Sequence, residues 1–177
     1  MVAAVVVFEP GTRIDGVDDS KRLTRADREE LDAVIRARAM AVAVGLVDAA
    51  TIDRVNVLEA TRRAMGQALA ALDVEPELVL TDFVKLEGLR CPQRNLVRGD
   101  QRSATVAAAS IIAKVARDRM MAEADREYPQ YGFGRHKGYP TAGHRAALLA
   151  HGPCLLHRRS FTGVAQPGLF EHAQGEE

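Results

Sequence analysis

Two carboxylates stand where they could hold a divalent metal ion. Asp82 directly follows the apolar run Leu78-Val79-Leu80-Thr81, and Asp100 follows a shorter run and precedes a long helical segment. Sheets in α/β proteins place their sites at the carboxyl ends of strands, and magnesium prefers carboxylate oxygens. Two-metal hydrolysis calls for about three or four such groups. The pair is therefore a partial metal site, and each aspartate taken alone also fits a turn or a helix cap.

A second candidate group is the loop at 132–141, which combines glycines, basic side chains and aromatic rings. Arg135 and Lys137 suit phosphate groups, and glycines allow a close approach of the backbone. Tyr139 could stack on a sugar or a base. The alternative is a structural loop in which Tyr139 belongs to the core.

Two further polar side chains stand beside predicted helix starts. Ser103 opens an Ala-rich helical segment and could present its hydroxyl to a phosphate at the positive end of that helix. Lys21 lies just before Thr24, the candidate N-cap of an earlier helix, and could also contact a phosphate. For the segment after Ser103, close packing of small side chains is an equally good interpretation.

Alternating strands and helices are expected to position these residues. Apolar runs predict strands at 2–8, 41–47 and 78–81, with a shorter one at 96–98. Helical periodicity and caps at Thr24 and Thr141 predict helices at 25–39, 57–72, 105–128 and 142–150. The pattern indicates one α/β domain over 1–165, followed by a flexible acidic tail at 166–177.

The composition fits one globular domain. The chain has 177 residues, of which 47% are hydrophobic and 27% charged, and its 24 basic and 24 acidic side chains balance. The charge is uneven, because no acid occurs from Tyr128 to Phe170. This suggests a surface for a polyanion, and on charge alone a solvated basic face is an equally good interpretation. Two cysteines and the lack of a membrane-length apolar run predict a cytoplasmic protein that does not enter a membrane.

The order and spacing of several motifs identify a family resemblance. Along the chain run Asp19-Ser-Lys-Arg-Leu23, Arg98-Gly-Asp100, Ala107-Ala-Ala-Ser-Ile111, Tyr131-Gly-Phe133, His136-Lys-Gly-Tyr139 and His157-Arg-Arg-Ser-Phe161. This series resembles bacterial ribonuclease HII, the type 2 ribonuclease H, from about Val2 to Phe161. The resemblance covers most of the chain.

The resemblance implies a ribonuclease H-like fold, with a mixed five-stranded sheet flanked by helices. It implies a monomeric endoribonuclease that cuts the RNA strand of RNA–DNA hybrids and nicks DNA 5′ of an embedded ribonucleotide, using Mg²⁺ or Mn²⁺. Asp82 and Asp100 match the third and fourth metal-binding carboxylates of the family. Tyr139 matches the tyrosine that stacks on the deoxyribose, and Lys21 and Ser103 fall near phosphate-facing positions.

One departure from the family is large. The adjacent Asp and Glu of the family's first strand, and the Gly-Arg-Gly motif that follows them, have no match in this sequence. The absent strand would be the central one, between the runs at 2–8 and 78–81. A late start codon, a fragment and a degenerate paralogue all account for this. A non-catalytic hybrid-binding protein and another two-metal nuclease of the same fold therefore stay as alternatives to the enzyme.

Overall fold

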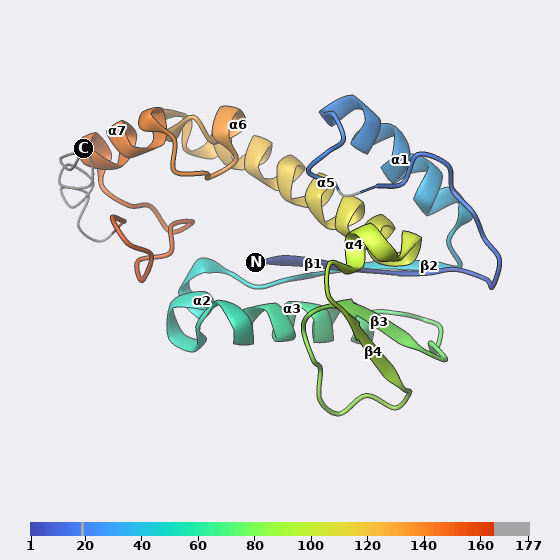
Figure 1. Ribbon diagram of the computed structural model, residues 1–177. Coiled ribbons are helices and arrows are strands. Elements are labelled where there is room, and N and C mark those ends of the chain that lie inside the picture. Colours follow the sequence, from blue (N-terminus) through green and yellow to red (C-terminus); the bar gives the residue numbers. More distant parts are fainter. Residues whose placement is uncertain (19, 165–177) are drawn as a thin grey trace, which may run out of the picture. The chain divides into compact units, whose positions relative to one another are not determined.

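The computed structural model describes residues 1–18 and 20–164, so the expected tail at 166–177 lies outside the described residues (Figure 1). The chain forms two compact units. The first combines Met1–Val47 with Leu58–Ala116, and the second combines Asp48–Val57 with the residues from Arg117 onward. No helix in the described ranges has the length and apolar character needed to cross a bilayer.

The first unit is built on an antiparallel strand pair. β1 (Val2–Val7) pairs with β2 (Ala41–Leu46) from Val2↔Leu46 to Val7↔Ala41. The connection between them is helix α1 (Arg25–Arg38), which begins where the sequence predicts. Thr24 Oγ1 accepts from the Asp27 amide at 3.2 Å, and Asp27 Oδ2 accepts from the Thr24 amide at 3.1 Å. This reciprocal capping fixes the start of the helix.

The two faces of the β1–β2 pair are covered by different helices. Val6 packs with Ile35 of α1 and with Ile111 and Ile112 of α5 (Ala104–Glu127) in one buried apolar cluster. On the opposite face lies α3 (Val57–Ala70), which approaches β2 at Gly45. A Cβ built at Gly45 would lie 1.8 Å from a backbone oxygen of α3, so only glycine permits this contact.

The second strand pair of this unit is parallel. β3 (Val79–Asp82) pairs with β4 (Gln93–Leu96), from Val79↔Gln93 to Asp82↔Leu96. The predicted strand at 96–98 is wrong in its bounds, because Arg98 has a left-handed φ of 55° and ends the extended backbone. The residues before it pair although they are polar, since the Gln93 side chain donates to Thr81 Oγ1 at 2.9 Å and to the Val84 carbonyl at 2.8 Å.

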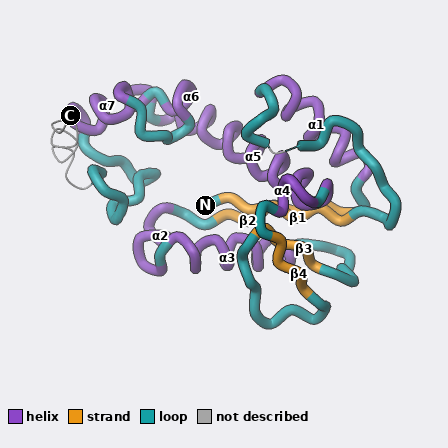
Figure 2. Tube along the Cα trace, viewed as in Figure 1, coloured by secondary structure: helices purple, strands orange, loops and turns teal. Residues whose placement is uncertain are grey.

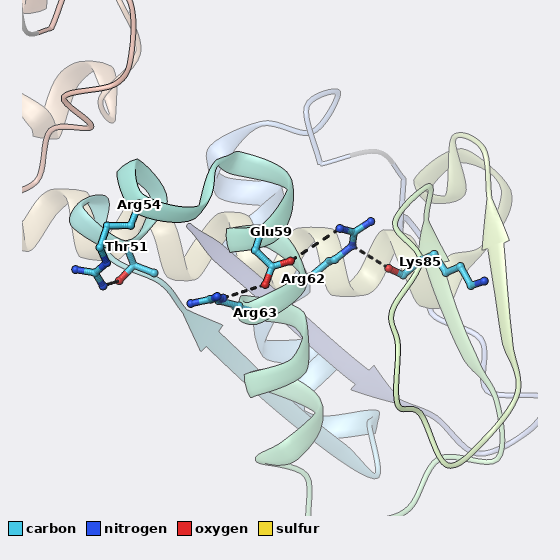
Figure 3. Close-up of polar contacts among 6 residues, drawn as sticks. All are labelled: Thr51, Arg54, Glu59, Arg62, Arg63 and Lys85. Atoms are coloured by element: carbon cyan, nitrogen blue, oxygen red, sulfur yellow. Dashed lines mark hydrogen bonds and ion pairs between the residues drawn. The ribbon is translucent and has the colours of Figure 1, made fainter.

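Polar contacts fix α3 to the segment that follows β3 (Figure 3). Glu59 Oε1 accepts from Arg63 Nε at 3.0 Å, and Arg62 Nε donates to the Lys85 carbonyl at 3.2 Å. The Glu59–Arg63 pair follows the i,i+4 spacing that supports a helix. The bond to Lys85 is tertiary, and it restrains the loop that leaves the end of β3.

The α/β class and the flanking of a small sheet by helices are confirmed (Figure 2). Within residues 1–18 and 20–164, however, the four strands form two separate two-stranded sheets, β1–β2 and β3–β4, rather than the five-stranded sheet that the family resemblance implies. No ladder joins β1 to β3. This is the place at which the sequence predicts an absent central strand.

The second unit consists of short helices around an aromatic core. It contains α2 (Ala49–Val55), the end of α5, the 3₁₀ turn η1 (Pro129–Tyr131), α6 (Phe133–His136) and α7 (Ala142–His151). Asp48 caps α2, and Thr141 caps α7 as expected. The segment 131–140 contains a short helix that the sequence prediction of a plain loop missed. Tyr131 and Phe133 stack at 5.3 Å and are buried, which explains why this glycine-rich segment is ordered locally.

Candidate functional site

Asp82 is the last residue of β3 and is exposed. One of its oxygens, Oδ1, accepts a hydrogen bond from the Gly99 amide at 2.9 Å. A carboxylate has further lone pairs that this bond leaves available. The bond therefore orients the Asp82 side chain without using up its capacity to bind a cation.

The same contact brings Asp100 close to Asp82. Gly99 and Asp100 open the short helix α4 (Gly99–Arg102), and a Cβ at Gly99 would lie only 3.3 Å from Asp82 Cα. The left-handed Arg98 turns the chain from β4 into this helix. The backbone thus places both predicted carboxylates at the carboxyl ends of the two parallel strands, where the sequence argument expected them.

The two carboxylates are of the type that a hard divalent cation prefers, but they are fewer than the about three or four that two-metal hydrolysis calls for. Asp82 and Asp100 offer carboxylate oxygens, which Mg²⁺ and Mn²⁺ prefer. Across residues 1–18 and 20–164, no group of three or more His, Cys, Asp or Glu side chains is arranged to hold a metal ion. In the described part of the first unit, these two carboxylates alone would be fewer than a two-metal site calls for.

The other two candidates of the first unit lie at helix starts. Ser103 Oγ accepts from the Val106 amide at 3.4 Å, so the hydroxyl caps the first turn of α5. The Ser103 amide donates to the Gly99 carbonyl at 2.9 Å, which connects this cap to the Asp82 contact through α4. Lys21 lies exposed in the turn before α1.

The Tyr139 loop belongs to the second unit and has an unusual backbone. Lys137 and Gly138 both adopt left-handed conformations, with φ of 52° and 79°. The Lys137 ammonium donates to the Gly134 carbonyl at 2.9 Å, so it folds back over its own loop. Tyr139 is 57% exposed, and its ring is therefore not part of the core. The interpretation of Tyr139 as a core residue is wrong.

A cavity of about 310 Å³ adjoins Tyr139, and its lining is basic and aromatic. The guanidinium of Arg158 lies 4.6 Å from the centroid of the Phe161 ring, a cation–π distance. The charged and aromatic residues of this lining are Arg117, Phe133, Tyr139, His144, Arg145, His157, Arg158 and Phe161. Arg135 is exposed and is not among the residues that line the cavity. This arrangement suits a phosphate beside a sugar or a base.

A buried histidine pair holds the backbone of Tyr139, and sequence reasoning missed it. His144 Nδ1 is 3.0 Å from the Tyr139 carbonyl, and His144 Nε2 is 2.9 Å from His157 Nε2. His157 Nδ1 accepts from the Cys154 amide at 3.0 Å. The protons are therefore assigned by the network: His157 Nε2 donates to His144, and His144 Nδ1 donates to Tyr139. Both rings are neutral in this arrangement.

Burial keeps both rings neutral. Desolvation first, and the neighbouring His144 second, lower the pKa of His157 to about 4. Burial also lowers the pKa of His144, against the bond to the Tyr139 carbonyl, which raises it. No sequence signal pairs two histidines that stand thirteen residues apart. The motifs His136-Lys-Gly-Tyr139 and His157-Arg-Arg-Ser-Phe161 contain or flank these groups without showing that they meet.

A second missed residue, Asp53, fixes the basic segment at 157–161. Its Oδ2 accepts from the Arg159 amide at 2.8 Å, and its Oδ1 accepts from the Ser160 amide at 3.0 Å and the Ser160 hydroxyl at 2.5 Å. These bonds, that of the Ser160 side chain first, lower the pKa of the Asp53 carboxyl. Asp53 therefore positions Arg158, which lines the cavity.

Comparisons with known proteins agree with the motif series. The family model described as Ribonuclease HII matches residues 1–164. Ribonuclease HII of Geobacter metallireducens is 48% identical over 166 residues, which are 94% of this chain and 78% of that protein. The crystal structure of ribonuclease H2 from Pyrococcus horikoshii OT3 is similar in fold, with a TM-score of 0.72 at 23% identity, covering 97% of this chain and 100% of that one. Bst-RNase HIII in complex with Mn²⁺ covers 89% of this chain and 59% of its own, with a TM-score of 0.58 at 18% identity.

Proposed function

The chain belongs to the ribonuclease HII family, and from this premise we propose that it cleaves the RNA strand of RNA–DNA hybrids and nicks DNA 5′ of embedded ribonucleotides. The proposal includes a need for Mg²⁺ or Mn²⁺ and hydrolysis by a two-metal mechanism. The observation that supports it best is the Gly99 amide bond to Asp82, because Gly99 directly precedes Asp100 at the start of α4.

In this proposal the two aspartates hold divalent cations and thereby set where the scissile phosphate can lie. A bound cation supplies the activation of water and the stabilisation of the leaving 3′-oxygen. The Gly99 hydrogen bond keeps Asp82 in one orientation, so less order has to be gained when a cation binds. Mn²⁺ is the ion named with the Bst-RNase HIII structure, and this supports a divalent metal of that class.

The second unit would hold the nucleic acid. Tyr139 is exposed enough to stack, and Arg158 and Arg145 line the adjoining cavity, so a backbone phosphate can be neutralised beside the ring. Arg135 and Lys137 add positive charge to the same loop. Contacts to phosphates and sugars carry no sequence information, which suits an enzyme that recognises a ribonucleotide within any sequence.

The test is a nicking assay on a DNA duplex with one ribonucleotide, in the presence of Mg²⁺ or Mn²⁺. Asp82→Asn and Asp100→Asn should abolish nicking while binding of the duplex persists. Asp73→Asn, at an exposed acid of a surface turn, is the matched control and should leave nicking unchanged. The rival function is a non-catalytic protein that binds hybrids. If the unaltered chain binds the duplex without metal and does not nick it at any concentration of either metal, the result would support that rival and contradict the proposed nuclease function.

A further inference from the structure

Phe83 directly follows Asp82, and its large apolar side chain is 75% exposed. Val97, at the end of β4, is 64% exposed. The two residues lie close together, because the Phe83 amide donates at 3.1 Å to the carbonyl of Leu96, the residue before Val97. Two apolar side chains therefore lie on the surface beside the ends of β3 and β4, next to the candidate metal site.

This surface is distinct from the cavity of about 840 Å³ between β1 and β3, the place at which a central strand is expected. Among the described residues, the lining of that cavity includes Thr81, Asp82 and Leu86, and it includes neither Phe83 nor Val97. The ring of Phe83 lies outside the cavity. Its exposure is therefore not owed to the open space between the two strand pairs.

The backbone of Phe83 is as unusual as its exposure. Its φ is 61°, a left-handed value that a bulky residue rarely adopts. The Val84 amide donates to the Asp82 carbonyl at 2.7 Å, two residues back, which closes a γ-turn with Phe83 at its centre. With a positive φ at the central residue, this is the rare and strained form of the γ-turn. A glycine at the same place would adopt this φ without steric cost.

Neighbouring side chains hold this strained turn in place. The side-chain amide of Asn95 donates to the Phe83 carbonyl at 3.3 Å. The Val84 carbonyl accepts from Thr81 Oγ1 at 2.7 Å and from Gln93 Nε2 at 2.8 Å. A strained residue persists only where its surroundings determine its backbone several times over, and such residues cluster at binding and catalytic sites. The turn thus keeps an exposed aromatic ring at a fixed place beside the candidate metal site.

The chemistry of a nucleic-acid duplex decides what such a ring can contact. In the proposed function, on which this inference rests, the scissile phosphate lies at Asp82 and Asp100. The faces of paired bases are covered by their stacked neighbours, whereas the sugars beside a phosphate present C–H groups to the surroundings. An aromatic ring packs against such apolar surface, and a contact to a sugar carries no sequence information.

We propose that Phe83 is a substrate-contacting residue, whose ring packs against a sugar of the nucleic acid beside the scissile phosphate, with Val97 at the edge of the same contact. Phe83 then supplies in the first unit what Tyr139 supplies in the second. The strained turn fixes the backbone of Phe83 before the nucleic acid arrives, so little backbone freedom is lost on binding. The contact adds affinity for a strand that lies across the two carboxylates, whatever its bases.

The test uses the whole 177-residue protein and a labelled DNA duplex with one ribonucleotide, and it measures binding by anisotropy without divalent metal, so that the duplex stays intact. Phe83→Gly keeps the turn and removes the ring. It should bind at least about fivefold more weakly, the low end of the effect of losing an aromatic stacking contact. Its Tm should stay equal or rise, because glycine relieves the strain. Leu58→Ala, at another exposed apolar residue of the first unit, is the matched control and should keep the affinity of the unaltered protein.

Phe83→Trp reports the contact directly, because the protein has no tryptophan of its own. This variant should bind as tightly as the unaltered protein, and the duplex should quench its fluorescence saturably, with the midpoint that anisotropy gives. Leu58→Trp should be quenched much less.

The outcomes separate the role of Phe83 from the proposed function. Equal affinity of Phe83→Gly and the unaltered protein would overturn the role of Phe83 and leave the nuclease function standing. So would a lower Tm of Phe83→Gly with unchanged affinity, or equal quenching of the two tryptophan variants. If the unaltered protein neither binds nor nicks the duplex, the proposed function itself fails, and the role of Phe83 fails with it.

Discussion

Acid should loosen the second unit through His157. The unfolded chain takes up a proton on this side chain near pH 6.5, whereas in the fold the pKa is lowered to about 4 because the ring is buried and faces His144. Protons therefore favour the unfolded state between these values. The stabilisation from the neutral ring is complete above pH 6.5 and is lost as the pH falls toward 4. At about 1.36 kcal/mol per pH unit, this loss is on the order of 3 kcal/mol.

The spectroscopy of this chain isolates the effect. The protein has three tyrosines and no tryptophan, and Tyr128, Tyr131 and Tyr139 all belong to the second unit. Near-ultraviolet circular dichroism of tyrosine during urea unfolding therefore reports that unit alone. Comparing pH 7 with pH 4.5 should show a large fall in the midpoint for the unaltered protein. Asp53 does not confuse the comparison, because its lowered pKa moves its own titration below this range.

His157→Gln removes the titrating group and keeps a donor for His144. This variant should start from a lower stability at pH 7 and lose much less of it at pH 4.5. His151→Gln, at an exposed histidine of α7, is the matched control and should follow the unaltered protein. If the unaltered protein and His157→Gln lose equal stability between the two pH values, the assignment of a buried neutral pair is wrong.

Three further predictions concern substrate and stability. Tyr139→Ala should lower nicking at a single ribonucleotide by roughly tenfold to a hundredfold, since a stacked ring is worth about 1–3 kcal/mol; an equal loss on all substrates together with a lower Tm would contradict a stacking role. Affinity for an RNA–DNA hybrid should fall with salt, with roughly one unit of log–log slope for each phosphate contact, and Arg158→Gln should reduce that slope by about one; affinity that is flat from low to moderate salt would refute a backbone-tracking surface. A version of the chain lengthened by the in-frame codons upstream of Met1 should melt at a higher temperature and nick faster than residues 1–177. The reason is that a covalently joined strand would pair with β1 and β3 and add carboxylates beside Asp82. Equal Tm and equal nicking by both forms would show that no such strand is needed.

The features that the sequence predicts well are local ones. Thr24 and Thr141 cap their helices within three residues of chain, so the relevant contacts are encoded side by side. Apolar runs likewise predict β1 and β2 to within one residue at each end. Apolar runs do not predict the strand 93–96, because its residues are mostly polar. Its contacts are to residues distant in the sequence, such as the bonds of Gln93 to Thr81 and Val84.

The candidate site divides in the same way. Asp82 and Asp100 are predictable because strand ends and the motif order mark them. The bond that couples them runs from the Gly99 amide to Asp82 across 17 residues, which no local pattern shows. His144, His157 and Asp53 are positioning residues: the two histidines meet across thirteen residues, and Asp53 binds partners more than a hundred residues away. Such residues become visible only when the fold brings their partners together.

The contact at Gly45 limits how this chain can be improved by directed evolution. Ala60, Ala64 and Ala68 are fully buried along α3, and the helix backbone lies against β2 where Gly45 has no side chain. Backbone atoms thus set the distance between α3 and β2, and a substitution cannot remove backbone atoms. A library that enlarges any of these four positions will return mostly unfolded clones, whatever the chemistry of the substituent. Gains in thermostability must be sought at positions where side chains, rather than main chains, determine the spacing.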